Sequence, residues 1–435
     1  MSRAEKIYKR KVIDEILKYL FDEETLILYG SRQVGKTFIL YWLEEYLNNK
    51  KQQVYYLDLE ERRYLAELNQ GPENLRKLLI EEGYNLERRV FVLIDEIQYL
   101  NNPTNFLKLI ADHYRNIKVI ASGSSVFEIR KKVEKALVGR ALFFEIYGLS
   151  FEEFLIFKGY EKGLEPVLTK IKEEELREVF EEFVLYGSYP KISLIPEKEK
   201  KEKYLWQIVD TYLKKDIRDL AEVREIEKFN KLLEVLASQS SNLLNIEELS
   251  NTCRIAKQTV ERYLSILEKT YVVHLVKPFF KNLRSELFKT PKIYFYDSGL
   301  AHLLWLKIIS PEILGGIFET AVFSELVKCF GRESVYYWRT KDKKEIDFIL
   351  RYRNRIIPLE TKINFASFSK SPVNYFLDRY GLKEYYFVGL KGEKREGPFI
   401  FPWEISGIEI NNRGQSLFIL TILVVGLSGL VAQVL

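Results

Sequence analysis

The segment Gly30–Thr37, GSRQVGKT, lies between two apolar stretches of different periodicity. The stretch before it, TLILY, is a continuous apolar run typical of a buried parallel strand. In the stretch after it, FILYWLEEYL, the apolar residues recur at helical spacing. The sequence therefore predicts a strand, a glycine-bounded loop and a helix, an order that is typical of α/β folds.

A loop of this kind is suited to binding phosphate. Gly30 and Gly35 permit backbone conformations in which successive N–H groups point into one concavity, and the following helix adds its positive N-terminal end. Lys36 is then placed to reach the β- and γ-phosphates, and the hydroxyl of Thr37 to coordinate Mg²⁺. We therefore expect a P-loop that binds ATP and Mg²⁺. The expected binding residues of the loop also include Ser31, Arg32, Gln33 and Val34.

A second apolar run, Val90–Ile94, ends in Asp95 and Glu96. Its composition predicts a buried parallel strand, which places both carboxylates at the carboxyl edge of the sheet. There Asp95 would hold Mg²⁺ through water, and Glu96 would polarise the water that attacks the γ-phosphate. The pattern is that of a Walker B motif. The alternative is a strand that ends in solvated acids.

Two less specific signals follow. The apolar strand in IKVIASGSS ends in small polar residues, where Ser122 or Ser124 could sense the γ-phosphate, although such residues often form only a turn. Arg140 lies between apolar residues after a charged helix. It could neutralise transition-state charge in its own subunit or in a neighbouring one, or it could cap a helix.

Charge and cysteine content limit the classes of protein and site. The 435 residues, 47% of them hydrophobic, suffice for roughly two to four separate cores. The net charge is +5, from 67 basic and 62 acidic residues, so any nucleic-acid site must be local. Cys253 and Cys329 lie far apart, and with three histidines no zinc site can form from neighbouring residues. A reducing cytosol is the simplest location.

The two ends of the chain differ in character. In residues 1–20, charges interrupt every apolar stretch, which excludes a secretory signal and predicts an amphipathic helix. Residues 416–435 carry no charge over about 20 residues, the length needed to cross a bilayer core. With Arg413 as the nearest charge, a tail at 413–435 would anchor a cytoplasmic protein to a membrane. The alternatives are a buried terminal helix and an extension without a role.

Residues 151–230 are rich in Glu, Lys and aromatic residues at helical spacing and predict a helical lid or linker, broken at Gly187 and Pro190. Residues 231–310 predict a winged helix, with Asn245 capping its first helix. Val260, Leu264 and Leu267 would be buried in the second helix, and residues 277–289 would form a basic wing. The expected exposed residues of this recognition helix are Lys257, Gln258, Thr259 and Arg262. The module would contact DNA, or it would serve only for packing or protein docking.

The last part of the chain carries a second possible chemistry. Residues 315–330 predict an amphipathic helix that contains Glu319, and residues 335–363 predict three successive strands. Asp347 lies in the second strand, and Glu360 and Lys362 share one face of the third while Thr361 points away. Glu319, Asp347 and Glu360 could bind Mg²⁺, and Lys362 could orient or activate a water for phosphodiester hydrolysis. The alternatives are an inactive binding platform and an unrelated structure.

Several of these motifs together resemble a prokaryotic family of AAA+ ATPases that is common in archaea. They are the P-loop, LIDEIQ, ASGSS, GRALFFEIYGLSFEEF and YGSYPK, and the resemblance covers roughly residues 10–400. It implies that Lys36, Thr37, Asp95 and Glu96 are ATP-site residues and that Arg140 matches a recurrent Gly-Arg. It also implies a C-terminal domain similar to PD-(D/E)XK nucleases, although the proline that normally heads that motif is missing here.

The sequence thus predicts an α/β protein in five parts. They are a P-loop AAA+ core with a parallel sheet (1–150), a helical lid (151–230), a winged helix (231–310), a restriction-endonuclease-like α/β domain (311–405) and the apolar tail (413–435). We expect Mg²⁺-dependent ATP hydrolysis. Two classes of function remain: an ATP-gated DNA-processing enzyme, and a nucleotide switch that docks protein partners or a membrane without cutting DNA. Both are compatible with a homo-oligomer.

Overall fold

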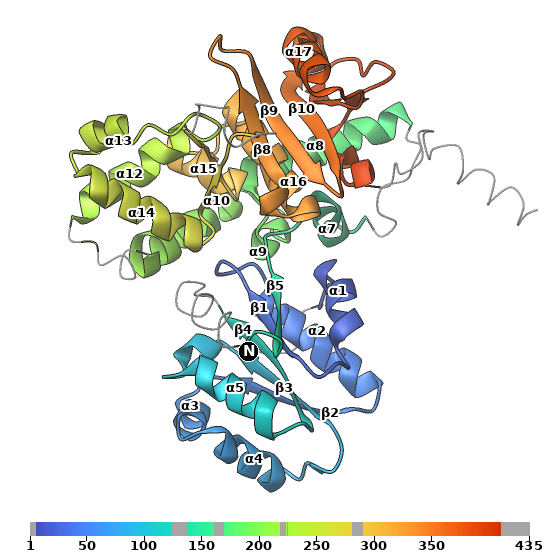
Figure 1. Cartoon of the computed structure of the whole chain (residues 1–435), viewed down its shortest axis with the longest axis vertical. Coiled ribbons are helices and arrows are strands. Elements are labelled where there is room, and N and C mark those ends of the chain that lie inside the picture. The colour runs from blue at the N-terminus through green and yellow to red at the C-terminus, as the bar shows by residue number, and fades with distance from the viewer. Residues whose placement is uncertain are drawn as a thin grey trace, which may run out of the picture.

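The computed structural model of the chain describes residues 6–123, 137–160, 169–217, 223, 225–280 and 290–409. An N-terminal α/β unit lies at one end of the molecule, and a helical lobe and a second sheet lie side by side at the other (Figure 1). Ser124 and the apolar tail at 413–435 lie outside the described residues. Within the described ranges, no helix has the length and apolarity to cross a membrane.

The N-terminal unit is built on a five-stranded sheet in the order β2-β3-β4-β1-β5, in which all neighbouring strands are parallel. The strands are β1 (Thr25–Tyr29), β2 (Gln53–Asp58), β3 (Val90–Asp95), β4 (Ile117–Gly123) and β5 (Ala141–Glu145). Its helices are α1 (Val12–Tyr19), α2 (Lys36–Asn49), α3 (Arg62–Asn69), α4 (Pro72–Glu81) and α5 (Pro103–His113). The predicted parallel α/β core and the N-terminal helix are both present.

Helices cover both faces of this sheet. Alternate side chains of each strand point to opposite faces, so neighbouring residues belong to different apolar clusters. Leu26 and Leu28 of β1 belong to one hydrophobic cluster, together with residues of α1 and α2. Ile27, between them, belongs to a second cluster with residues of α3, α4 and α5. Burial on both faces explains why β1 and β3 are continuous apolar runs in the sequence, whereas the partly exposed β2 is not.

The helices that follow the sheet pack mostly on later parts of the chain. They are α7 (Phe151–Phe157), α8 (Lys170–Tyr186), α9 (Pro190–Ser193) and α10 (Lys198–Ile208). Helix α8 contacts α15 (Ser298–Leu306) and α16 (Gly315–Phe330), and in Figure 1 it lies behind the second sheet. The short helix α9 lies at the junction with the N-terminal unit. The segment predicted as a helical lid or linker thus packs against α15 and α16 of the C-terminal part.

The helical lobe has the element order expected of the third part. It consists of α12 (Ile226–Ser238), α13 (Ile246–Cys253), α14 (Lys257–Lys269) and the antiparallel pair β6 (Val273–Val276) and β7 (Lys292–Phe295). The Asn245 side chain accepts hydrogen bonds from the N–H groups of Glu247 and Glu248, both at 3.1 Å, so the predicted cap is confirmed. Val260, Leu264 and Leu267 are buried, also as predicted. Residues 281–289 of the predicted wing lie outside the described ranges.

The second sheet has the order β12-β11-β10-β9-β8. Its elements are β8 (Val335–Arg339), β9 (Glu345–Tyr352), β10 (Arg355–Asn364), α17 (Ser371–Tyr380), β11 (Tyr386–Lys391) and β12 (Phe399–Ile400). The three successive strands predicted here are confirmed. The expectation that α16 is amphipathic is wrong, because the helix is enclosed between the sheet and α8 and α15. Even Thr320, Ser324 and Glu325 are buried.

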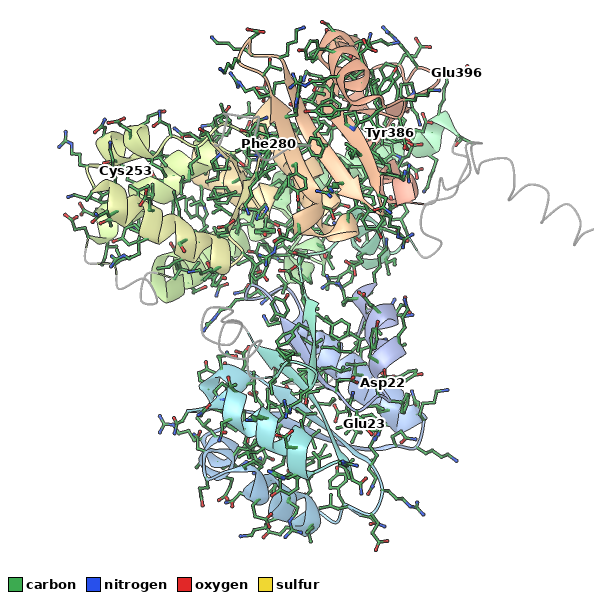
Figure 2. The ribbon with its side chains drawn as sticks, in the orientation of Figure 1. Asp22, Glu23, Cys253, Phe280, Tyr386 and Glu396 are labelled. Carbon is green, nitrogen blue, oxygen red and sulfur yellow. The ribbon has the colours of Figure 1, made fainter. Side chains whose placement is uncertain are left out.

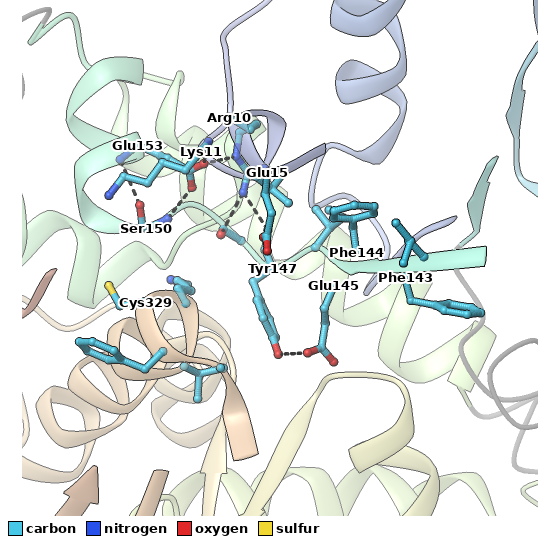
Figure 3. Close-up of a pocket in the computed structure, with 18 of the residues that line it drawn as sticks. Arg10, Lys11, Glu15, Phe143, Phe144, Glu145, Tyr147, Ser150, Glu153 and Cys329 are labelled. Carbon is cyan, nitrogen blue, oxygen red and sulfur yellow. Dashed lines mark hydrogen bonds and ion pairs between the residues drawn. The ribbon is translucent and has the colours of Figure 1, made fainter. Parts of the chain in front are cut away.

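A buried ion pair links the segment before α1 to helix α7, which follows the first sheet. Arg10 donates from Nε to Glu153 Oε1 at 2.9 Å and from Nη1 to the P-loop carbonyl of Val34 at 2.8 Å. Its Nη2 donates to the carbonyls of Tyr147 and Gly148 at 3.0 and 3.2 Å, where the chain leaves the sheet. Figure 3 shows this arrangement at the edge of a cavity of about 580 Å³ that extends to α16. One guanidinium thus ties the N-terminal segment, the P-loop and the exit from the sheet together.

A second junction lies beside it. Asp297, which caps α15, accepts hydrogen bonds at Oδ2 from the N–H and hydroxyl of Ser188, at 2.7 and 2.9 Å. The carbonyl of Ser188 accepts from the N–H of Leu149, at 2.7 Å. A side chain at Gly148 would collide with Ser188, so the chain segments can approach this closely only with glycine there. The YGSYPK motif is therefore a point where three distant segments meet.

Substitution of Arg10 should lower stability strongly. Burial acts to raise the pKa of Glu153, but Arg10 and the N–H groups of Ser150 and Lys11 hold it below its ordinary value. The change Arg10→Met leaves this buried carboxylate without its cation, so we expect the free energy of unfolding to fall by about 3 to 5 kcal/mol. Urea unfolding at pH 7 measures the difference.

The matched control is Lys9→Met, which removes a cation whose side chain is 47% exposed, and we expect a change of less than about 0.5 kcal/mol. The pKa of Glu153 is lower in the folded chain than its ordinary value of 4.5. The stabilisation from the ion pair is therefore fully present above pH 4.5, and it is lost as the pH falls through the pKa of the folded chain. Equal stability of the Lys9 and Arg10 variants at pH 7 would contradict this account.

Candidate functional site

The P-loop follows β1 at the carboxyl edge of the first sheet. A side chain at Gly30 would collide with the backbone oxygen of Ile146, and Gly35 has a φ of 93°, in the left-handed region. Both positions therefore require glycine, the first for a close approach and the second for its backbone conformation. Helix α2 begins immediately afterwards at Lys36, so its N-terminal N–H groups face the loop, an arrangement suited to phosphate.

Lys36 is enclosed by the loop that precedes it. Its side chain is buried, and Nζ donates to the carbonyls of Gly30 at 3.2 Å and Ser31 at 2.7 Å. Burial lowers the pKa of Lys36 to about 8, although Glu96 and Asp95 act to raise it. A buried ammonium held by backbone carbonyls can be transferred to a stronger acceptor, such as a phosphate oxygen.

The predicted carboxylates lie at the same edge of the sheet. Asp95 is buried, accepts a hydrogen bond from the Ser122 hydroxyl at Oδ1, and accepts another from the Tyr56 hydroxyl at Oδ2 at 3.1 Å. The N–H of Glu96 lies 3.1 Å from Asp95 Oδ1. Of the two serines considered from the sequence, Ser122 contacts the carboxylate, while Ser124 lies outside the described residues. These contacts fix the orientation of Asp95.

Glu96 has an unusual backbone. Its φ of 55° lies in the left-handed region, which costs a residue other than glycine about 1 to 2 kcal/mol. The Gln98 side chain donates a hydrogen bond to Glu96 Oε2. Such strained residues cluster at active sites. The conformation turns the chain sharply after β3, so that Glu96 does not continue the line of the strand.

The residues of this edge fit a nucleotide with Mg²⁺. Asp95 is a fixed carboxylate, Thr37 is half-buried at the start of α2, and Lys36 supplies a positive charge. Oxygen ligands of this kind are those that Mg²⁺ prefers. Among the other loop residues, Ser31 and Val34 are buried, whereas Arg32 and Gln33 are exposed.

The structure separates Arg140 from this edge. It precedes β5, and Ala141 pairs with Thr25 at the start of β1, whereas the P-loop follows the end of β1. Its Nε instead contacts Asp112 Oδ1, at 2.5 Å. The expectation that Arg140 serves the ATP site of its own subunit is therefore wrong in this arrangement. A role in a neighbouring subunit stays a prediction.

The residues predicted for the second site do come together. Lys362 Nζ lies 2.7 Å from Glu360 Oε1 and 3.7 Å from Asp347 Oδ2. Thr361 was expected to point away, but its N–H and hydroxyl both donate to Asp347 Oδ2, at 2.8 and 2.9 Å. Strand β10 keeps a regular register with β11 from Leu359 to Lys362, so Thr361 reaches Asp347 without a break in its own strand.

A lysine that the sequence did not indicate lies among these carboxylates. Lys292 Nζ lies 2.6 Å from Glu345 Oε1, 3.3 Å from Glu319 Oε1 and 3.9 Å from Asp347 Oδ1. Burial acts to lower the pKa of Lys292, but the three carboxylates together raise it above its ordinary value. Burial and the charge of Asp347 raise the pKa of Glu319 to about 7.

The second site therefore does not fit a metal ion as it stands, because a buried ammonium contacts the oxygens that would bind it. In the described part of the chain, no three His, Cys, Asp or Glu side chains are grouped so that they could hold a metal. Burial and Asp347 also raise the pKa of Glu360 to about 7.

The predicted recognition helix, α14, presents part of the expected surface. Lys257, Gln258 and Arg262 are exposed, as predicted, while Thr259 is half-buried. Lys257 Nζ pairs with Glu247 Oε1 at 2.9 Å. The two cysteines are free, with Cys253 in the helical lobe (Figure 2) and Cys329 on α16, so neither belongs to a site described above.

Sequence reasoning missed three residues that shape these sites: Arg10, Tyr56 and Lys292. Tyr56 lies on β2, whose Asp58 pairs with Asp95, so a strand-order prediction could have found it. Arg10 and Lys292 carry no motif. Each acts on residues far away in the sequence, and only the tertiary fold brings them there.

Comparison with known proteins agrees with this geometry for the N-terminal unit. Residues 22–155 match the family described as an AAA domain. This unit is similar to AAA domains. Its parallel sheet and P-loop are those of an α/β nucleotide-binding fold. Residues 177–312 and 314–396 match two domains of unknown function, DUF8612 and DUF4143.

Whole-chain relatives extend across most of the sequence. An uncharacterized protein of Methanocaldococcus jannaschii is 26% identical, with coverage of 80% of this chain and 77% of its own. An uncharacterized protein of Haemophilus influenzae is 23% identical, with coverage of 94% and 98%. A solved structure of AMPPCP-bound DnaA from Aquifex aeolicus has a TM-score of 0.26 and 20% identity, over 59% of this chain and 86% of that one.

The amine of the AAA-like unit's Lys36 should titrate well below the ordinary lysine pKa of 10.5. Because burial lowers its pKa to about 8, its NMR signal should move between pH 7 and 9 in the nucleotide-free chain. The Lys36→Ala variant assigns the signal by its loss. An amine at this position that titrates near 10.5 would contradict the enclosed arrangement of the loop.

Proposed function

We propose that the chain is a Mg²⁺-dependent ATP hydrolase. The observation that carries the proposal is the meeting of Lys36, Thr37, Asp95 and Glu96 at one edge of the first sheet. The loop N–H groups and Lys36 would hold the phosphates, and Thr37 and Asp95 would hold Mg²⁺, which neutralises phosphate charge when bound. Glu96 would orient and polarise the attacking water.

Hydrolysis in this site would affect the segments that lead into the rest of the chain, and Arg10 would carry the effect. The same guanidinium contacts the P-loop carbonyl of Val34 and the carbonyls of Tyr147 and Gly148. Pro190, at the start of α9, lies against Gly35. A change in the loop on nucleotide binding or release would therefore be transmitted to the segments that lead into the rest of the chain.

We further propose that the helical lobe binds nucleic acid and that ATP turnover is coupled to this binding. Lys257, Gln258 and Arg262 lie exposed on α14, the second helix of an α13–α14 pair followed by a β-hairpin. That order is the one expected of a winged helix with its recognition helix outward. The competing proposal is that this lobe docks a protein partner and that the chain is a nucleotide switch. Neither proposal includes nuclease activity, because the ammonium of Lys292 occupies the second site.

Two substitutions should separate ATP binding from turnover. Lys36→Ala removes the side-chain cation from the phosphates, so we expect most ATP binding to be lost. Glu96→Gln keeps the shape of the site but cannot activate water, so binding should remain while turnover falls by about 10² or more. Calorimetry with a non-hydrolysable ATP analogue and a phosphate-release assay measure the two effects. Hydrolysis by Glu96→Gln at the unsubstituted rate would reject the assignment of Glu96.

Nucleic-acid binding should depend on salt and on α14. The double change Lys257→Glu and Arg262→Glu should weaken binding of duplex DNA, and each lost phosphate contact should reduce the slope of log affinity against log salt by about 1. The control is Lys228→Glu on α12, which makes the same change of charge at a single residue outside α14. It should leave DNA binding unchanged. If DNA neither binds the chain nor stimulates its ATPase at low salt, the protein-docking proposal replaces this one.

A further inference from the structure

The carboxylate cluster of the second sheet is completed by a strand of the helical lobe. Strand β7 carries Lys292 and Tyr294 on the same face, and both reach Glu319 of α16. The Tyr294 hydroxyl donates to Glu319 Oε1 at 2.5 Å, and Lys292 Nζ lies 3.3 Å from the same atom. The cluster thus belongs to two parts of the chain.

The position of the ammonium is that of a cation between ligands. Lys292 has 3% of its side chain exposed and contacts carboxylate oxygens from α16 and from two residues of β9, Glu345 and Asp347. A divalent ion bound there would use the same oxygens, which would have to move in to about 2.0 to 2.6 Å from it. The ammonium and a metal ion therefore compete for one place.

Other oxygens of these carboxylates also accept hydrogen bonds. Asp347 Oδ2 accepts two hydrogen bonds from Thr361, and Glu360 Oε1 accepts one from Lys362. Glu345 Oε2 accepts from Arg339 Nη1 at 2.6 Å. Buried carboxylates need such partners, because an unpaired charge away from water is costly.

Strand pairing holds Lys292 in place. Its strand, β7, pairs with β6 through Val276↔Lys292 and His274↔Tyr294, and the Lys292 position also bridges to Leu243. These pairings fix the backbone from which the Lys292 side chain reaches the cluster, so a shift of the hairpin would withdraw the ammonium.

We propose that Lys292 is a built-in cation that occupies the place of a divalent metal between Glu319 and Asp347 and so closes this cluster to Mg²⁺. The inference does not depend on the ATPase proposal, because none of the contacts that carry it involves the N-terminal unit. Strand β7 of the helical lobe thus blocks metal binding at the carboxylate cluster of α16 and β9. Access of metal to the cluster then depends on the position of β7.

Binding of Mn²⁺ to the nucleotide-free full chain, followed by the loss of the free-ion EPR signal, tests the proposal. All proteins carry Asp95→Asn, so that the first sheet loses the carboxylate proposed to hold Mg²⁺. The otherwise unsubstituted chain should bind no Mn²⁺ at the cluster. Lys292→Met should gain one bound ion, with an affinity at least about tenfold above any residual Mn²⁺ binding of the reference chain, because the carboxylate charge becomes available to a metal.

Controls make the result specific. Lys343→Met removes an exposed lysine of the same domain and should bind no more Mn²⁺ than the unsubstituted chain. Adding Asp347→Asn to Lys292→Met should abolish the gained binding. Melting curves from circular dichroism show whether each variant folds. If Lys292→Met does not fold, the double change Lys292→Met and Glu345→Gln, which removes one charge of each sign, should fold and gain the ion.

Three results would overturn the proposal. The first is Mn²⁺ binding by the otherwise unsubstituted chain that Asp347→Asn removes, which would mean that Lys292 does not exclude the metal. The second is the absence of any gain in both Lys292 variants. The third is a gain that survives Asp347→Asn, which would place the ion elsewhere.

Discussion

The hydrogen bonds of Arg10 are the interaction on which the rest of the architecture depends. A guanidinium offers donors in a fixed plane, and here they reach one carboxylate, Glu153, and three backbone carbonyls, those of Val34, Tyr147 and Gly148. A lysine could not serve all of these acceptors with the same geometry. The nucleotide loop and the start of the helical region are therefore held in a fixed relation by one side chain.

The junction around Asp297 complements this arrangement. It holds Ser188 against the start of α15, and Ser188 in turn holds Leu149 just after the first sheet. Both junctions lie at the same exit from the sheet, so the P-loop and the start of α15 are both tied to the segment Tyr147–Leu149. The AAA-like unit is thus attached to its neighbours by specific hydrogen bonds as well as by apolar packing.

The parts of the fold that were predictable are those with a local cause. The P-loop, the apolar strands of the first sheet and the cap at Asn245 each follow from a short pattern, and the structure contains them. The second site was only half predictable. Strand alternation placed Glu360 and Lys362 on one face, and Asp347 was expected beside them as a metal ligand. Nothing near Lys292 in the sequence indicates that β7 would bring its ammonium there. Burial all around α16 was likewise invisible, because it depends on which elements surround the helix.

One cluster of buried apolar side chains extends from Ile13, near the N-terminus, to Ile408, and includes residues of both sheets and of the helical lobe. Lobes with separate interiors can be exchanged between genes, because each retains a complete apolar interior after the cut. A break within this chain would instead expose apolar faces on both fragments. The units that match different family descriptions should therefore be inherited together, and changes in one would select for compensating changes in the others.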